Sequence, residues 1–190
     1  MVSAFDVSTV NPNPARFDLK KAEAINAEHV RRLTPEDFLA RTIPYLEDQG
    51  VVAHPPTDTE LEVLREILPH VQPRVGLLGE VPGMVGFLFL DDAAVVIDDD
   101  ARSQLRDQAG EVLERSISTL EELSEWSAEA LEQALRAVLV EQMEISPRHA
   151  FTPLRVAISG RRVSPPLFES MELLGKDASI ARLTGLRQSL

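Results

Sequence analysis

Apolar residues recur at helical spacing along most of the chain. Between Asp18 and Leu33 they fall at about every third position, with lysines and arginines on the other sides of the segment, which predicts a helix. Two later segments, Thr34-Pro35-Glu36-Asp37 and Thr57-Asp58-Thr59-Glu60, place a capping hydroxyl before acidic residues, as helix starts do. We expect the first of these helices to reach about Gly50 with a bend at Pro44, and a shorter helix to follow Pro73.

The middle of the chain has a less regular pattern. Between Gly79 and Ile97, glycines and a proline interrupt two apolar runs that fit either strands or buried helical turns, and we favour helical turns. The acidic run Asp98-Asp99-Asp100 predicts a helix that continues to Leu113 with an interruption near Gly110. Ser127 predicts the start of another helix.

After Ser146 the pattern predicts short helices separated by Gly160, Pro165-Pro166 and Gly175. The whole pattern predicts an all-α fold with two small helical lobes and a break near residues 91–100. Trp126, the only tryptophan, is expected to anchor helices in this fold.

Charge is distributed unevenly along the 190 residues. The net charge of −12 argues against a nucleic-acid partner, but the segment 146–190 carries seven basic and three acidic residues, a net +4, which leaves −16 for residues 1–145. This asymmetry suits a protein whose acidic bulk repels polyanions while one region attracts phosphate. Arginine outnumbers lysine 16 to 3, which fits base stacking and forked hydrogen bonds, although GC-rich codon usage produces the same bias.

Several kinds of chemistry find no support. The chain has no cysteine, its four histidines lack metal-ligand spacing, and its glycine-rich stretch lacks the Gly-Lys-Ser/Thr of a phosphate-binding loop. The run Asp98-Asp99-Asp100 fits a magnesium site, but acidic runs more often cap helices. We therefore expect no catalytic residue, no metal and no cofactor in this chain. No apolar run is long enough to span a membrane, and no secretion signal is present, so we expect a cytoplasmic protein.

Arg155 lies among apolar residues on a predicted buried helix, so its guanidinium must find acceptors. The residues alone favour an internal carboxylate or helix-end carbonyls over an RNA base. His149, beside Arg148, suits either an ordinary surface role or a phosphate contact.

Two segments resemble a known family. Residues 17–33, Phe-Asp-Leu-Lys-Lys-Ala-Glu-Ala-Ile-Asn-Ala-Glu-His-Val-Arg-Arg-Leu, are similar to the segment of bacterial glutamyl-tRNA synthetases, a class I family, that follows the active-site lysine loop. Residues 153–160, Pro-Leu-Arg-Val-Ala-Ile-Ser-Gly, and 163–175, with Val-Ser-Pro-Pro-Leu-Phe-Glu, resemble the end of the same enzymes, above all the actinobacterial ones. The family's His-x-Gly-His and Lys-x-Ser-Lys signatures are missing, so we expect a piece of a longer enzyme, inactive alone.

The resemblance implies a domain organisation and a binding site. Residues 1–42 correspond to a remnant of the stem-contact domain, and residues 43–100 and 101–190 to two anticodon-binding lobes. The family's anticodon contacts fall on Arg155 and on the turn Ser164-Pro165-Pro166-Leu167, with Arg74 as the expected reader of the first anticodon base. An exposed turn stiffened by two prolines suits splayed bases. Basic residues expected on the tRNA backbone are Lys20, Lys21, Arg148, His149, Arg161 and Arg162.

The implied partner is tRNA-Glu, bound by a monomer without DNA or a membrane, for an enzyme that attaches glutamate to tRNA using ATP and magnesium in a catalytic domain outside this chain. The alternative is a free-standing helical protein-interaction module that has lost its RNA surface, which is compatible with the net charge of −12.

Overall fold

The structure, a computed structural model, describes residues 18–190, without the side chain of Ala93. The irregular opening segment predicted before Asp18, and that part of the expected stem-contact remnant, lie outside the described residues. The longer helices are α1 (Leu19–Arg31), α2 (Pro35–Asp48), α3 (Asp58–Val71), α6 (Ala109–Glu122), α7 (Ala128–Leu135), α8 (Pro147–Ser159), α9 (Leu167–Leu174) and α10 (Lys176–Gln188). Shorter helical segments are η3 (Gln72–Arg74), η4 (Leu78–Glu80), α4 (Val81–Val85), η5 (Gly86–Phe89), η6 (Asp92–Ala94), α5 (Asp99–Arg102) and η7 (Arg136–Gln142). The described residues contain no strand, which confirms the all-α prediction.

The predicted helix starts are capped as their sequences indicate. Thr34 Oγ1 accepts a hydrogen bond from the Asp37 amide at 3.1 Å, at the start of α2. At the start of α3, Thr57 Oγ1 accepts from the Glu60 amide while the Glu60 carboxylate accepts from the Thr57 amide, which is a complete capping box. At the start of α7, Ser127 Oγ accepts a hydrogen bond from the Ala130 amide at 3.3 Å. These contacts satisfy amide groups that have no partner within the helix.

Two predicted helices differ from the structure. The helix expected from Asp98 to Leu113 is broken earlier, because α5 ends at Arg102 and α6 begins at Ala109, so Gly110 lies in the first turn of α6. A glycine is tolerated there because a helix's first turn makes few internal hydrogen bonds. The helix expected after Pro73 is only the single 3-10 turn η3, and the glycine-rich stretch that follows forms short helical turns, as favoured.

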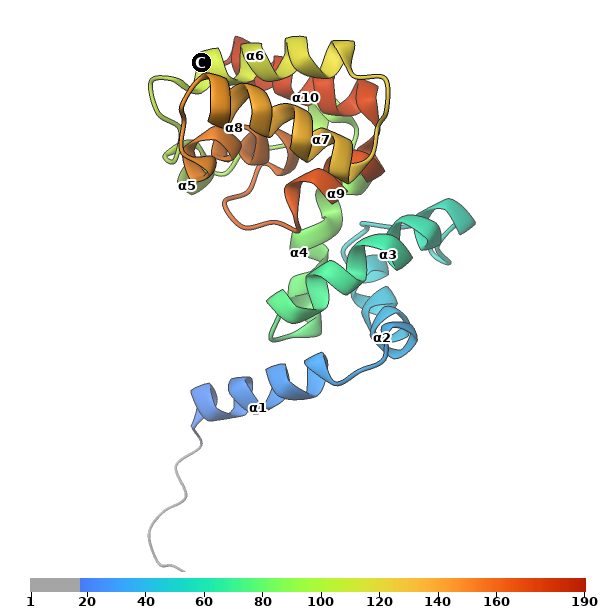
Figure 1. Ribbon diagram of the computed structural model, residues 1–190. Coiled ribbons are helices and arrows are strands. Elements are labelled where there is room, and N and C mark those ends of the chain that lie inside the picture. Colours follow the sequence, from blue (N-terminus) through green and yellow to red (C-terminus); the bar gives the residue numbers. More distant parts are fainter. Residues whose placement is uncertain (1–17) are drawn as a thin grey trace, which may run out of the picture.

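Buried side chains form two cores. The first core extends from Val30 to Val85 and is built on α2, α3 and α4, while the second begins at Phe87 and includes α6 to α10. Figure 1 shows the corresponding two bodies, with α4 leading from one to the other. The predicted domain boundaries at 42 and 100 stay predictions.

We call the body around the first core the first lobe and the body around the second core the second lobe. The first lobe includes the end of α1. Gln72 Nε2 donates to the backbone oxygens of Val30 and Leu33, both at 2.9 Å, and thereby fastens the end of α1 to η3. The start of α1 extends away from the second lobe (Figure 1). Its exposed Leu19 and Ile25 have no core to enter.

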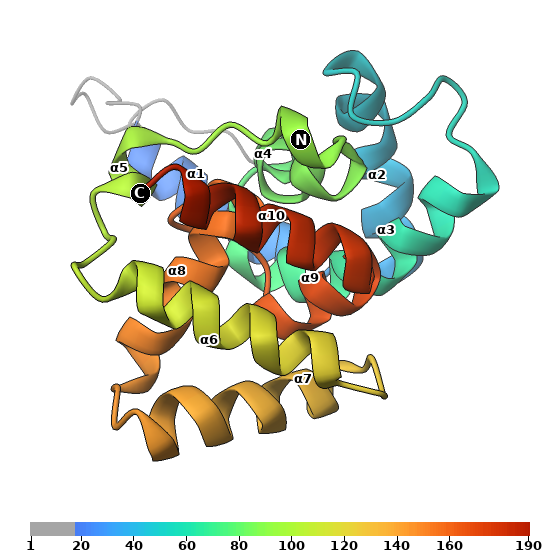
Figure 2. The ribbon, with the colours of Figure 1, turned by 90° about the horizontal axis from the view of Figure 1, so that it is seen from above.

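Within the second lobe, α10 packs along α6 and against α8, as Figure 2 shows from above. Trp126 Nε1 donates to the Met171 oxygen at 3.0 Å, which joins the start of α7 to α9 and confirms its role as an inter-helix anchor. No helix in residues 18–190 has the length and apolar character needed to cross a bilayer.

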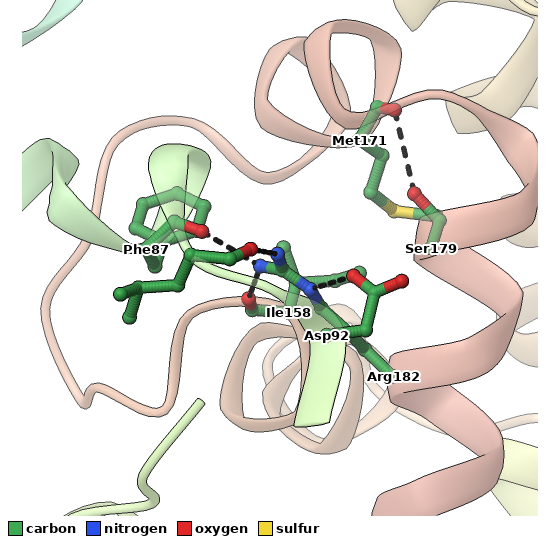
Figure 3. Close-up of polar contacts among 7 residues, drawn as sticks. Phe87, Asp92, Ile158, Met171, Ser179 and Arg182 are labelled. Atoms are coloured by element: carbon green, nitrogen blue, oxygen red, sulfur yellow. Dashed lines mark hydrogen bonds and ion pairs between the residues drawn. The ribbon is translucent and has the colours of Figure 1, made fainter. Parts of the chain in front are cut away.

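Arg182 fastens the segment between the lobes onto the second core. Its side chain on α10 is 2% exposed, and it donates to the Phe87, Leu90 and Ile158 backbone oxygens at 2.9 to 3.0 Å and to Asp92 Oδ1 at 2.8 Å. Figure 3 shows the guanidinium at the centre of these acceptors. The residues joining the lobes are therefore held by one buried cation, each of whose three nitrogens donates a hydrogen bond.

Candidate nucleic-acid interface

Arg155 organises the turn that follows α8. Its Nη1 donates to Ser164 Oγ at 2.7 Å and to the Pro165 oxygen at 2.9 Å, and Ser164 Oγ also lies 3.2 Å from that oxygen. The acceptors are therefore a hydroxyl and a loop carbonyl, instead of the internal carboxylate or helix-end carbonyls that the residues alone favoured. Arg155 and the turn form one unit, which brings together the residues expected to contact the anticodon.

The turn is less exposed than predicted. Ser164 is 8% exposed and Leu167 4%, Pro165 is also buried, and only Pro166 is half-buried. The reason is packing, because Leu167 begins α9 and enters the second core. The expectation of an exposed turn was wrong, and the surface left for a base consists of Pro166 and the outer edge of Arg155.

Gly160 ends α8 and directs the chain into this turn. Its φ of +68° is left-handed, and a Cβ placed there would lie 2.2 Å from the Val96 oxygen, so no other residue fits. The Gly160 oxygen accepts from the Asp98 amide at 2.9 Å, which attaches the loop to the start of α5.

Arg74 comes from the first lobe, yet it acts on Arg155. Burial lowers the pKa of Arg155 from its ordinary value, the positive charge of Arg74 lowers it further, and the carboxylate of Glu169 opposes this by raising it. Arg74 is exposed at the end of η3, where its Nη1 donates to the His70 oxygen. The charges of Arg74 and Glu169 thus influence Arg155 in opposite directions.

The expected backbone-contact residues divide into groups. Arg148 and Arg162 are exposed, and with Arg161 they line the same small cavity as Arg155. His149 is placed otherwise: its Nδ1 lies 3.0 Å from Ser146 Oγ, and the residue lines a different hollow, beside Glu144.

Lys20 and Lys21 lie apart from this group. Both are exposed in the first turn of α1, at the far end of the first lobe from α8 (Figure 1). Within the described residues, the structure therefore gathers Arg148, Arg161 and Arg162 beside Arg155 and leaves His149 and the two lysines separate.

Three residues of this region were not identified from the sequence. Thr152 follows Arg148 by four positions on α8, and this helical spacing is a signal that places it on the same face. Gln104 and Glu169 come from other elements, and no local pattern places either beside Arg155, because their positions depend on how the helices pack.

A family match identifies the class of protein. Residues 37–186 match the family model described as an anticodon binding domain, and the chain belongs to that family.

The relatives that it resembles are glutamate–tRNA ligases. The chain is 58% identical over 192 residues to the ligase of Leifsonia xyli subsp. xyli, which covers 100% of the chain and 39% of that protein. It is 54% identical to the ligase of Kineococcus radiotolerans, covering 38% of it. The actinobacterial resemblance is confirmed, and the chain spans less than two-fifths of these relatives' length.

Solved structures agree in fold. The chain superposes on a glutamate tRNA ligase from Elizabethkingia meningosepticum with a TM-score of 0.76, over 98% of this chain and 35% of that one. At 20% identity, this likeness supports the fold alone.

Proposed function

We propose that this chain reads the anticodon of tRNA-Glu for a glutamate–tRNA ligase, an enzyme that joins glutamate to tRNA with ATP. The observation that carries the proposal is the unit that Arg155 forms with the turn Ser164–Leu167 through its hydrogen bonds to Ser164 and Pro165. The charge of Arg74, on the first lobe, acts on the same arginine and lowers its pKa. An arginine stacks on or bonds to the edge of an unstacked base, and a proline ring offers an apolar face. Arg74 would read the first anticodon base, and Arg155 with the turn would read the others.

The chemistry of such a ligase belongs to the part of the relatives that this chain does not cover. ATP and magnesium would bind there, and this chain alone would charge no tRNA. We infer that the chain works as a monomer in the cytoplasm, with tRNA rather than DNA as its partner.

Filter binding of tRNA-Glu at low and moderate salt tests this proposal. The chain should retain tRNA-Glu better than an unrelated tRNA, and retention should fall as salt rises, because phosphate contacts release counterions. Arg155→Lys keeps the charge but loses the planar fork, and Arg74→Gln removes an exposed charge, so each should weaken binding by about fivefold or more.

Arg65→Gln is the matched control, since Arg65 is an exposed arginine of α3 outside this region. The affinity of the Arg65→Gln variant for tRNA-Glu should stay within about twofold of that of the unsubstituted chain. If neither tRNA is retained at any salt, the protein-interaction module is the better account. Equal retention of both tRNAs would rule out anticodon reading.

A further inference from the structure

Four arginines surround one small cavity beside the Arg155 turn. The cavity has a volume of about 150 Å³, and its polar lining, which we call the arginine pocket, consists of Gln104, Arg148, Thr152, Arg155, Arg161 and Arg162. Arg148, Thr152 and Arg155 lie on one face of α8, because they are spaced by four and three positions. The loop after Gly160 supplies the facing wall.

The arginine pocket carries a concentrated positive charge in an acidic protein. None of its lining residues is a carboxylate. Asp98 pairs with Arg161 Nη1 at 3.0 Å, but within residues 18–190 no acidic side chain lies within 4 Å of the Arg148, Arg155 or Arg162 guanidinium. Asp98, paired with Arg161, and Glu169, whose charge acts on Arg155, are fewer than the four arginines, so a net positive charge remains to attract an anion.

Bringing these cations together is unfavourable without an anion. Burial and the charge of Arg74 already disfavour the ionised form of Arg155, whose pKa they lower. Like charges at close range repel more strongly where water is partly excluded. An anion placed among the guanidinium groups would offset both costs.

The pocket's size and donors select the kind of anion. Its volume of about 150 Å³ is below the roughly 300–1,000 Å³ of pockets that hold drug-sized ligands. Guanidinium forks match the oxygens of a phosphate bidentately, and the Thr152 hydroxyl and Gln104 amide add further polar groups. A compact phosphate group fits these features better than a base or a whole nucleotide.

We propose that the arginine pocket holds one phosphate group of the tRNA backbone, next to the bases that the Arg155 turn contacts. The proposal rests on the proposed function. Arg155 borders both the pocket and the turn, so a phosphate fixed in the pocket would set the position of the neighbouring base. The pocket would thus align the anticodon loop as well as attract it.

The salt dependence of tRNA-Glu binding tests the pocket. Arg148 and Arg162 are exposed, so the double variant Arg148→Gln/Arg162→Gln should fold, which a thermal melt checks. In it, the slope of log K against log salt should fall in magnitude by about one, the value of one phosphate contact. The control Arg65→Gln/Arg115→Gln removes the same charge from exposed sites elsewhere, and its slope should be unchanged.

An unchanged slope in the pocket variant, or an equal fall in the control, would overturn the phosphate site while leaving anticodon reading intact. If the chain without substitutions retains no tRNA, the proposed function fails. Stabilisation by inorganic phosphate then tests whether the arginine pocket binds a phosphate group. The melting temperature is then compared in phosphate and in chloride at equal ionic strength. Phosphate should raise the melting temperature of the unsubstituted chain and of the control variant, but not that of the pocket variant. Equal rises in all three would overturn the pocket.

Discussion

At the scale of single residues, Arg182 holds the segment between the lobes. The residue is 5% exposed, and its guanidinium donates to three backbone oxygens and one carboxylate. The sequence shows Arg182 only as one more basic residue of the tail. A buried clamp of this kind leaves no local signal, since its acceptors lie up to 95 positions away.

Arg182→Lys should lower the free energy of unfolding by at least about 2 kcal/mol, because a lysine cannot reach all four acceptors and leaves buried carbonyls unpaired. Urea unfolding measures the change. Arg187→Lys, at an exposed position of the same helix paired with Glu114, is the control and should change stability by less than about 0.5 kcal/mol. Equal changes in the free energy of unfolding of the two variants would show that the buried hydrogen bonds of Arg182 do not stabilise the protein more than an exposed ion pair does.

At the scale of elements, helix starts were predictable because their signals are local. Thr34, Thr57 and Ser127 each cap the helix that the sequence assigned to them. An interruption was predicted near Gly110, but the break lies earlier, between Arg102 and Ala109, where no glycine or proline marks it. Local chemistry therefore indicated where helices begin more accurately than where this one is interrupted.

The capping box of α3 predicts a pH dependence. The pKa of Glu60 is lowered, chiefly by the hydrogen bond from the Thr57 amide. Its contribution to stability is therefore complete above the unfolded-state pKa, near 4.3, and is lost as pH falls through the lower folded-state pKa. Glu60→Gln should destabilise the chain by about 1 kcal/mol at pH 7, and this difference should shrink in acid.

Unfolding in denaturant at pH 7 and at pH 3 checks this expectation. Glu62→Gln, an exposed position on the same helix, is the matched control and should change little at either pH. A Glu60→Gln difference that stays constant between the two pH values would contradict the carboxylate's role in the box.

At the scale of the whole molecule, the sequence predicted an all-α fold, and the resemblance to the synthetase family grouped Arg155 with the turn Ser164–Leu167. Neither established that the charge of Arg74 acts on Arg155, or that four arginines share one cavity, since these depend on how the lobes and loops pack. The turn's exposure was mispredicted for the same reason, because Leu167 enters a core that only the folded chain defines.

The most direct test of the account exchanges only the anticodon of tRNA-Glu. The chain's affinity is measured for tRNA-Glu and for the same transcript with its three anticodon bases replaced, at one salt concentration. The account predicts that the replacement weakens binding about tenfold or more, because it removes the base contacts of Arg74, Arg155 and the turn while the phosphates stay the same. Equal affinity for the two transcripts would contradict it.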